Sequence, residues 1–319
     1  MSRLFDTVLI VDWSARSTPS PARPSPDAIW IGSAGAGAEP PRYVRTRHAA
    51  EQYLRHRLRE AREAGRRVLV GFDFPFGYPA GFAEAVTGRA DALALWDDIA
   101  ARIEDAPDNR NNRFAVAAAF NACLPGIGPF WGCPVALDLA GLPARGNARA
   151  AHGLPERRRV ETRLRTAQPC WKLFTTGSVG GQALLGIPLL HRLRAALAPH
   201  VAVWPFDTGL SAPAAPIVLA EIYPSLLAAE IRAATRPGEI RDEAQVRVTA
   251  TALAALDAGG ALAPLFAAAS DLPLADRATV ALEEAWILGA GHEAALREVA
   301  RPSHAVAAPP APPEPAVLP

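Results

Sequence analysis

Short apolar segments and one clear helical pattern share the N-terminal quarter of the chain. Residues 49–67 have helical spacing, because Tyr53, Leu54 and Leu58 are apolar on one face and Gly65 stands near the C-terminal end. The other apolar segments are short, rich in β-branched or aromatic residues and bounded by turn-forming residues, which is typical of strands. They cover residues 4–12, 27–34, 42–46 and 68–79.

This order of elements predicts an α/β fold with a mixed sheet. The first three strands are close in sequence and pair as an antiparallel meander, and the helix at 49–67 then crosses over to bring the fourth strand in parallel. Asp12 and Asp73 stand at the C-terminal ends of the first and fourth strands. Because open α/β sheets usually have their sites at that edge, we expect a functional site there.

The middle of the chain is less regular. Residues 82–104 have a helical pattern, whereas residues 105–170 are polar and rich in Arg. This stretch is too long for a plain loop in a compact domain, so we interpret it as an insertion or a cap over the site. Residues 170–197 predict an extended piece, a Gly-rich turn and a helix.

The C-terminal half adds strands and helices and then changes composition. The predicted organisation is a single domain over residues 1–300 with an insertion at about 78–200, followed by a disordered tail rich in Pro and Ala at 301–319. Two further strands and three helices are predicted, at 201–206 and 215–225 for the strands and at 225–235, 242–257 and 275–299 for the helices.

Four acidic residues stand at the ends of predicted elements and are the candidate catalytic and metal-binding residues: Asp12, Asp73, Glu221 and Asp242. Carboxylates at adjacent strand ends repel one another unless a hard cation lies between them, and Mg²⁺ or Mn²⁺ suits such an all-oxygen site. Each residue also has a structural alternative. Glu221 can pair with an arginine, and Asp242 can cap its helix.

A Gly-rich turn before a predicted helix is the second candidate site. Backbone N–H groups at Gly177, Ser178 and Gly180 can hold a phosphate, although the Lys-Ser/Thr ending of a P-loop is missing. The structural alternative is capping of the helix by Ser178. Lys172 is the only lysine among 33 basic residues. Since arginine cannot replace a deprotonatable ammonium, Lys172 is a further candidate.

Composition narrows the classes of function. The chain has 319 residues, and its 33 Lys and Arg residues against 32 Asp and Glu residues give a net charge of +1. Electrostatic attraction of the whole protein to nucleic acid is therefore not indicated. Three cysteines without a CxxC pair exclude a disulfide framework or a zinc knuckle. We expect a cytoplasmic protein, because the apolar segments are too short for a signal peptide or a membrane span.

Seven short motifs follow one another along the chain: VDWSAR, GFDFPFGYP, KLFTTGSVGGQALLGIP, VWPFDTG, AEIYPS, RDEAQV and EEAWILG. In this order they resemble the bacterial DUF429 proteins, which are described as predicted nucleases of ribonuclease H-like fold. The resemblance covers roughly residues 7–290 and implies acids on the first and fourth strands, which Asp12 and Asp73 match, and a later acid, for which Glu221 and Asp242 match. It places Lys172 and Ser178 beside the site. Ala285 departs from the family's usual glycine.

Three hypotheses of function follow. The first is a phosphodiesterase or nuclease that depends on Mg²⁺ or Mn²⁺ and acts on nucleic acid or a small phosphoester. The second is a nucleotide- or phosphometabolite-binding protein of the actin-like ATPase type. The third is a non-catalytic regulatory module of the same fold. A serine hydrolase is not indicated, because the chain has no GxSxG motif.

Overall fold

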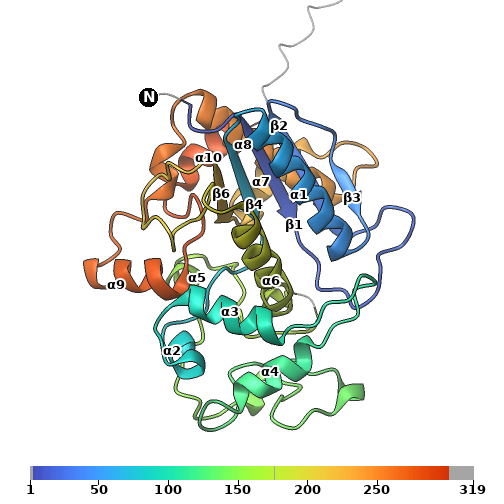
Figure 1. The fold of residues 1–319 in the computed structure, drawn as a ribbon, viewed down its shortest axis with the longest axis vertical. Helices are drawn as coiled ribbons and strands as arrows, with labels where there is room; N and C mark the ends of the chain where they lie inside the picture. Colours follow the sequence, from blue (N-terminus) through green and yellow to red (C-terminus); the bar gives the residue numbers. More distant parts are fainter. Residues whose placement is uncertain (1–2, 176, 302–319) are drawn as a thin grey trace, which may run out of the picture.

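A computed structural model describes residues 3–175 and 177–301, so all but the first residue of the predicted tail lies outside the described residues. One six-stranded sheet lies at the centre of the fold (Figure 1), and its strands follow the order β3-β2-β1-β4-β6-β5. The strands are β1 (Thr7–Asp12), β2 (Ile29–Gly35), β3 (Arg42–Val44), β4 (Val68–Phe72), β5 (Val201–Val203) and β6 (Ile217–Glu221).

The pairing of the strands confirms the predicted α/β fold with a mixed sheet. Strands β1, β2 and β3 form the antiparallel meander, and β4 pairs with β1 in parallel after the crossover through α1. Strands β6 and β5 extend the parallel half of the sheet. The helices are α1 (Arg47–Glu63), α2 (Phe82–Thr87), α3 (Ala92–Arg102), α4 (Arg113–Asn121), α5 (Arg159–Arg163), α6 (Val179–Leu197), α7 (Ala228–Ala234), α8 (Arg241–Ala258), α9 (Leu274–Thr279) and α10 (Glu293–Ala300).

Helices cover both faces of the sheet, which explains why β1 is buried along its whole length and apolar from Val8 to Val11. Successive side chains of a strand point to opposite faces. Leu9 and Val11 accordingly belong to the hydrophobic core shared with α1, α3 and α6, whereas Val8 and Ile10 belong to the core shared with α8. Figure 1 shows α1 and α6 on one side of the sheet and α8 on the other. Both cores meet the sheet at its central strands.

The segment between β4 and β5 contains more helix than its polar composition predicts. The stretch at 105–170 includes α4 and α5, and the helix predicted over 82–104 is broken at Gly88, which has a φ of 74°. Residues 170–173 form no strand and make only an isolated bridge between Trp131 and Lys172. Aromatic side chains hold this segment together, among them Tyr78, Phe82, Phe120, Phe130 and Trp171.

The single helix predicted over 275–299 is wrong. Helix α9 continues as one π-helical turn (Val280–Glu284) and stops at Ala285, whose φ of 62° and ψ of 179° are incompatible with a helix. The chain then runs beside β6, where Leu288 donates its N–H to the Glu221 carbonyl at 2.9 Å. Helix α10 begins only at Glu293.

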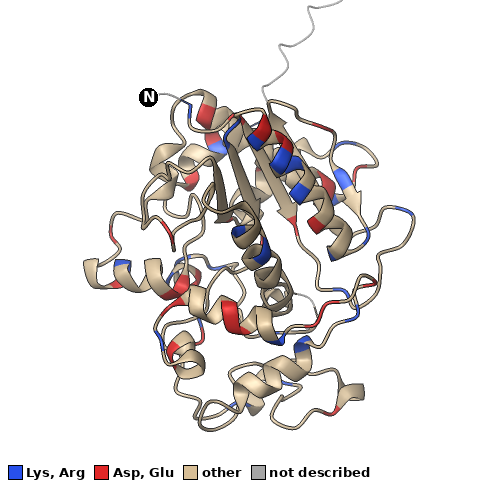
Figure 2. Cartoon of the chain, viewed as in Figure 1, with Lys and Arg blue, Asp and Glu red and all other residues tan. Residues whose placement is uncertain are grey.

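Charged residues of both signs are interspersed over the fold. Figure 2 shows Lys and Arg positions alternating with Asp and Glu positions along helices such as α1, in agreement with the net charge of +1. None of the helices in the described ranges has the length and apolar character that a membrane crossing requires.

Candidate active site

Asp12 and Asp73 lie side by side at the C-terminal edge of the sheet. Val11 is paired with Phe72 in the parallel β1–β4 ladder. Asp12 and Asp73 are the next residues after this pair, so their carboxyl groups lie close together. They lie within hydrogen-bonding reach of each other, and Asp12 is only 8% exposed. The Asp73 Oδ1 also accepts the Trp13 N–H at 2.7 Å. The predicted convergence of these two acids is confirmed.

The electrostatics of this pair favour a bound proton or cation. Burial raises the pKa of Asp12 well above its usual range, and the negative charges of Asp73 and Asp242 raise it further. Burial likewise raises the pKa of Asp73 to about 7, although the hydrogen bond from the Trp13 N–H opposes this rise. Without a metal ion, the pair therefore retains a proton near neutral pH.

Helix α8 places two more polar side chains at the same edge. Asp242 lies in its first turn, and its Oδ2 accepts the Asp27 N–H at 2.9 Å. Burial raises the pKa of Asp242 as well. Gln245 donates from Nε2 to the Asp12 Oδ2 at 3.1 Å. Gln245 was not among the predicted site residues. It lies three residues after Asp242, so the two side chains share one face of the helix.

Glu221 pairs with an arginine, which is the structural alternative predicted for it, and does not join the other acids. Its oxygens accept hydrogen bonds from Arg158 Nη1 and Nη2 at 2.7 and 2.6 Å and from the Phe76 N–H at 2.9 Å. Glu221 is paired with Phe72, so it stands one residue earlier in the ladder than Asp73. Because side chains alternate along a strand, its carboxylate points to the opposite face of the sheet. The structure therefore corrects the placement of Glu221 with the other acids.

The four candidates around the Gly-rich turn have separate environments. Gly177, with a φ of 76°, and Ser178 line the cavity beside Asp12, but the Ser178 side chain does not cap α6. The Gly180 N–H donates to the Lys172 carbonyl at 3.0 Å, so its predicted role in holding a phosphate is wrong. A Cβ at Gly180 would lie 2.2 Å from the Cys170 carbonyl oxygen, so this glycine is needed for close packing. The Lys172 Nζ lies 5.5 Å from the centre of the Trp131 ring. Neither Gly180 nor Lys172 is among the described residues that line the cavity.

A cavity of about 750 Å³ opens in front of the acidic pair. Its walls come from the chain after β1, the start of α4, the residues before α6 and the start of α8. Three side chains that the sequence did not single out contribute to it: Arg113, Phe174 and Gln182. Gln182 donates to the Trp13 carbonyl and so joins α6 to the end of β1.

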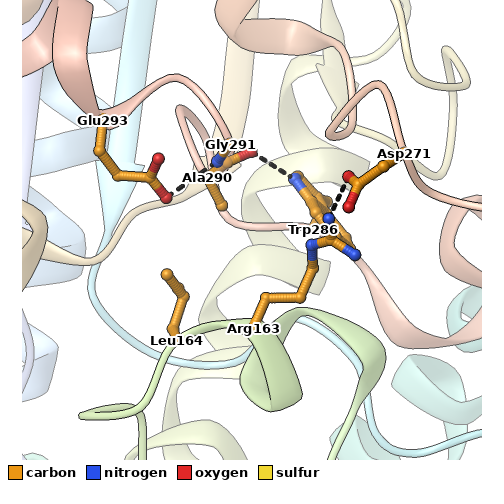
Figure 3. A pocket seen from close by; sticks show the side chains of 7 residues that line it. All are labelled: Arg163, Leu164, Asp271, Trp286, Ala290, Gly291 and Glu293. Carbon is orange, nitrogen blue, oxygen red and sulfur yellow. Dashed lines mark hydrogen bonds and ion pairs between the residues drawn. The ribbon is translucent and has the colours of Figure 1, made fainter.

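A second cavity, of about 410 Å³, lies away from the acidic pair (Figure 3). Its polar groups are already paired: Arg163 with Asp271, the Glu293 carboxylate with the Gly291 N–H, and the Trp286 Nε1 with the Ala290 carbonyl. The first contact joins α5 to Asp271, and the other two lie within the segment at 286–293. These paired groups give no sign of a ligand site in this cavity.

The acidic pair fits a divalent cation with few protein ligands. Within residues 3–175 and 177–301, no three or more His, Cys, Asp or Glu side chains are grouped so that they hold a metal ion. Mg²⁺ commonly keeps several water ligands and uses only one or two carboxylates. Asp12, which is buried, and Asp73, which is half-buried, are close enough for the charge of Asp73 to act on Asp12 and meet that requirement.

Comparisons with known proteins find no matching family model, no matching curated protein and no matching solved structure. The similarity to DUF429 proteins and the ribonuclease H-like assignment of the fold thus stay predictions.

Proposed function

We propose that the chain is a phosphodiesterase or nuclease that depends on Mg²⁺ or Mn²⁺. The observation that supports this proposal is the pair of carboxyl groups, the buried Asp12 and the half-buried Asp73, close together at the C-terminal edge of parallel strands and facing a large cavity. Burial raises the pKa of both groups, and the negative charge of Asp73 raises the pKa of Asp12 further; a divalent cation would relieve this repulsion.

The sheet topology also supports the proposal. A three-stranded antiparallel meander, a crossover helix and a parallel fourth strand match the arrangement that we expect for a ribonuclease H-like fold. That fold is expected to contribute acids from its first and fourth strands, and Asp12 and Asp73 occupy these places. Fold alone does not establish function, so the acids remain the main support.

The residues would divide the chemistry as follows. Asp12 and Asp73 would hold the cation, which would supply a bound water of lowered pKa and positive charge opposite a phosphate. Gln245 fixes the orientation of the Asp12 carboxylate through its hydrogen bond, and the Trp13 N–H does the same for Asp73. Asp242 lines the cavity. Among the described contacts only its Oδ2 accepts a hydrogen bond, so its Oδ1 is available to orient a water or a substrate hydroxyl.

The experiment is cleavage of a panel of substrates: single- and double-stranded DNA and RNA, and a generic phosphodiester. Each is incubated with Mn²⁺ or with a chelator, with wild-type protein and Asp12→Asn. Asp108→Asn, an exposed acid outside the cavity, is the matched control. We expect cleavage only with metal, a loss of at least 100-fold in Asp12→Asn, and wild-type cleavage in Asp108→Asn.

Two results would contradict the proposal. Cleavage that survives in a folded Asp12→Asn protein would place the activity elsewhere or in a contaminant. No cleavage by any of the proteins, together with no binding of Mn²⁺ by the wild type in calorimetry, would exclude the metal-dependent reaction.

A further inference from the structure

Arg113 is a buried cation that forms no ion pair with a carboxylate among the described residues. It is only 4% exposed, and its Nη1 donates to the Ser17 hydroxyl at 2.9 Å and to the Asn111 Oδ1 at 2.8 Å. Its buried Nε has no acceptor among the described residues. Arg47, buried nearby, differs because Asp105 accepts two hydrogen bonds from it at 2.6 Å. Arg113 thus has a buried donor that the described chain leaves unmatched, and a charge that Asp105, itself paired with Arg47, offsets only in part.

The charge of Arg113 persists at neutral pH. Burial and the neighbouring charge of Arg47 lower the pKa of Arg113, but only to about 10. A buried charge without a counterion is unfavourable, so such residues are retained where an anion binds. A guanidinium presents a planar fork of donors that matches phosphate geometry.

The position of Arg113 points to an anion in the proposed active site. Arg113 lines the same cavity as Asp12 and Asp73. It also lies against the N-terminal turn of α6, since a Cβ at Gly181 would be 3.4 Å from the Arg113 Nε. Helix α6 has 19 residues, and the Ser178 side chain makes no capping hydrogen bond, although the Gly180 N–H donates to the Lys172 carbonyl and the Gly181 N–H to the Ser178 carbonyl. The guanidinium and the positive end of the helix dipole therefore favour negative charge at the same place.

An exposed aromatic side chain lies at the same wall of the cavity. Phe174 lines the cavity and is 47% exposed. Its ring packs edge-on against Phe114 with centres 6.3 Å apart, and the Arg113 guanidinium lies over the Phe114 ring at 4.2 Å. Phe174 is thus held in place on one side and open on the other. Open aromatic faces of this kind stack on nucleic acid bases.

We infer that this cavity binds a nucleotide, with a phosphate on Arg113 and the base stacked on Phe174. Any reaction of the bound nucleotide rests on the proposed function, whereas its binding does not. The cavity of about 750 Å³ has room for a nucleotide unit. A free mononucleotide and one nucleotide of a single-stranded nucleic acid both offer this combination of a phosphate and a base.

The test is calorimetric binding in the presence of a chelator, so that no metal contributes. The probes are inorganic phosphate, a 5′-mononucleotide and a short single-stranded oligonucleotide. Wild-type protein is compared with Arg113→Gln and Phe174→Ala. The matched controls are Arg110→Gln and Val135→Ala, which change exposed side chains that do not line the cavity.

Arg113→Gln should weaken binding of all three probes by tenfold or more. Phe174→Ala should weaken the mononucleotide and the oligonucleotide by about tenfold and leave inorganic phosphate unchanged. The controls should bind as the wild type does. Tighter binding of the mononucleotide or of the oligonucleotide then identifies the natural source of the ligand, and either result supports the inference.

A second measurement does not depend on whether Arg113→Gln folds. In the wild-type protein, the NMR resonance of the Arg113 Nε–H should shift during titration with phosphate. Unchanged affinity in folded Arg113→Gln, an unmoved resonance, or no binding of any probe at millimolar concentration would overturn the inference. Because these experiments exclude metal, they separate it from the proposed hydrolysis: binding without cleavage would support this inference and contradict only the proposed function.

Discussion

Arg158 and Glu221 form a fully buried ion pair with two hydrogen bonds, from Nη1 and Nη2 to the two carboxylate oxygens. The Arg158 side chain is 1% exposed, and it also donates to the Glu161 carboxylate and to the Glu284 carbonyl. These contacts join the residues before α5 to the end of β6 and to the turn that precedes Ala285. The pair therefore fixes the segment between β4 and β5 against the sheet.

Glu221→Gln should destabilise the protein, because it leaves the Arg158 charge buried and only partly compensated. We expect a loss of about 3 kcal/mol in the free energy of unfolding, measured with urea. Binding of Mn²⁺ to the folded variant should not change. Glu156→Gln, at a more exposed pair with Arg149, is the control and should cost less than about 1 kcal/mol. Wild-type stability with lost Mn²⁺ binding would return Glu221 to the metal site.

Asp12→Asn should stabilise the metal-free protein at alkaline pH. The folded pKa values of Asp12 and Asp73 are raised above 3.8. Their contribution to stability is therefore complete below that pH and is lost as the pH rises through about 7. Removing one charge should raise the free energy of unfolding by about 2 kcal/mol at pH 8 and by much less at pH 4.

Thermal unfolding in chelator at the two pH values checks this prediction, with Asp108→Asn as the control for a surface acid. A variant that is less stable than the wild type at pH 8 would show that the two carboxyl groups do not repel each other in the folded protein.

Binding of Mn²⁺ should release a proton from the carboxyl pair. Because Asp73 has a pKa of about 7, the metal competes with a proton at neutral pH. The apparent affinity should then rise by up to about tenfold for each unit between pH 5 and 7 and level off above it. Calorimetry in two buffers of different ionisation enthalpy measures the released proton. An affinity independent of pH would refute the shared proton.

Ala285→Gly should stabilise the fold. The φ of 62° and ψ of 179° at Ala285 lie in a region that is essentially restricted to glycine. Relief of this strain should exceed the added freedom of the unfolded chain and give a net gain of about 1 kcal/mol in the free energy of unfolding. Ala267→Gly is the matched control. Ala267 has a φ of −89°, so this substitution should be neutral or destabilising. A loss in both variants would contradict the strain.

Sequence reasoning found the parts of the site that depend on local pattern. Asp12 and Asp73 follow buried strands, and the parallel pairing of these strands could be predicted from the crossover helix. The placement of Glu221 beside the other acids could not be tested from the sequence. A shift of one residue along a strand moves a side chain to the opposite face of the sheet, and the register of the strands is set by tertiary pairing. Without a structure, the apolar run around Glu221 does not show which residue stands level with Asp73.

Arg113 and Phe174 could not be found in this way. Both belong to the irregular segment between β4 and β5, where one arginine among many has no distinguishing pattern. Only packing against Gly181 and Phe114 brings them to the sheet edge. The break at Ala285 was hidden for a related reason, since alanine is a strong helix former and the tertiary fold overrides its preference.

The contact between Gln245 and Asp12 joins residues 233 positions apart in the chain. A polypeptide emerging from a ribosome contains β1, β4 and both acids long before α8 has been made. Until α8 docks, one face of the sheet is bare, and the acidic pair lacks Gln245 and Asp242 beside it. Completion of the candidate site is thus tied to the synthesis and docking of α8, late in the chain.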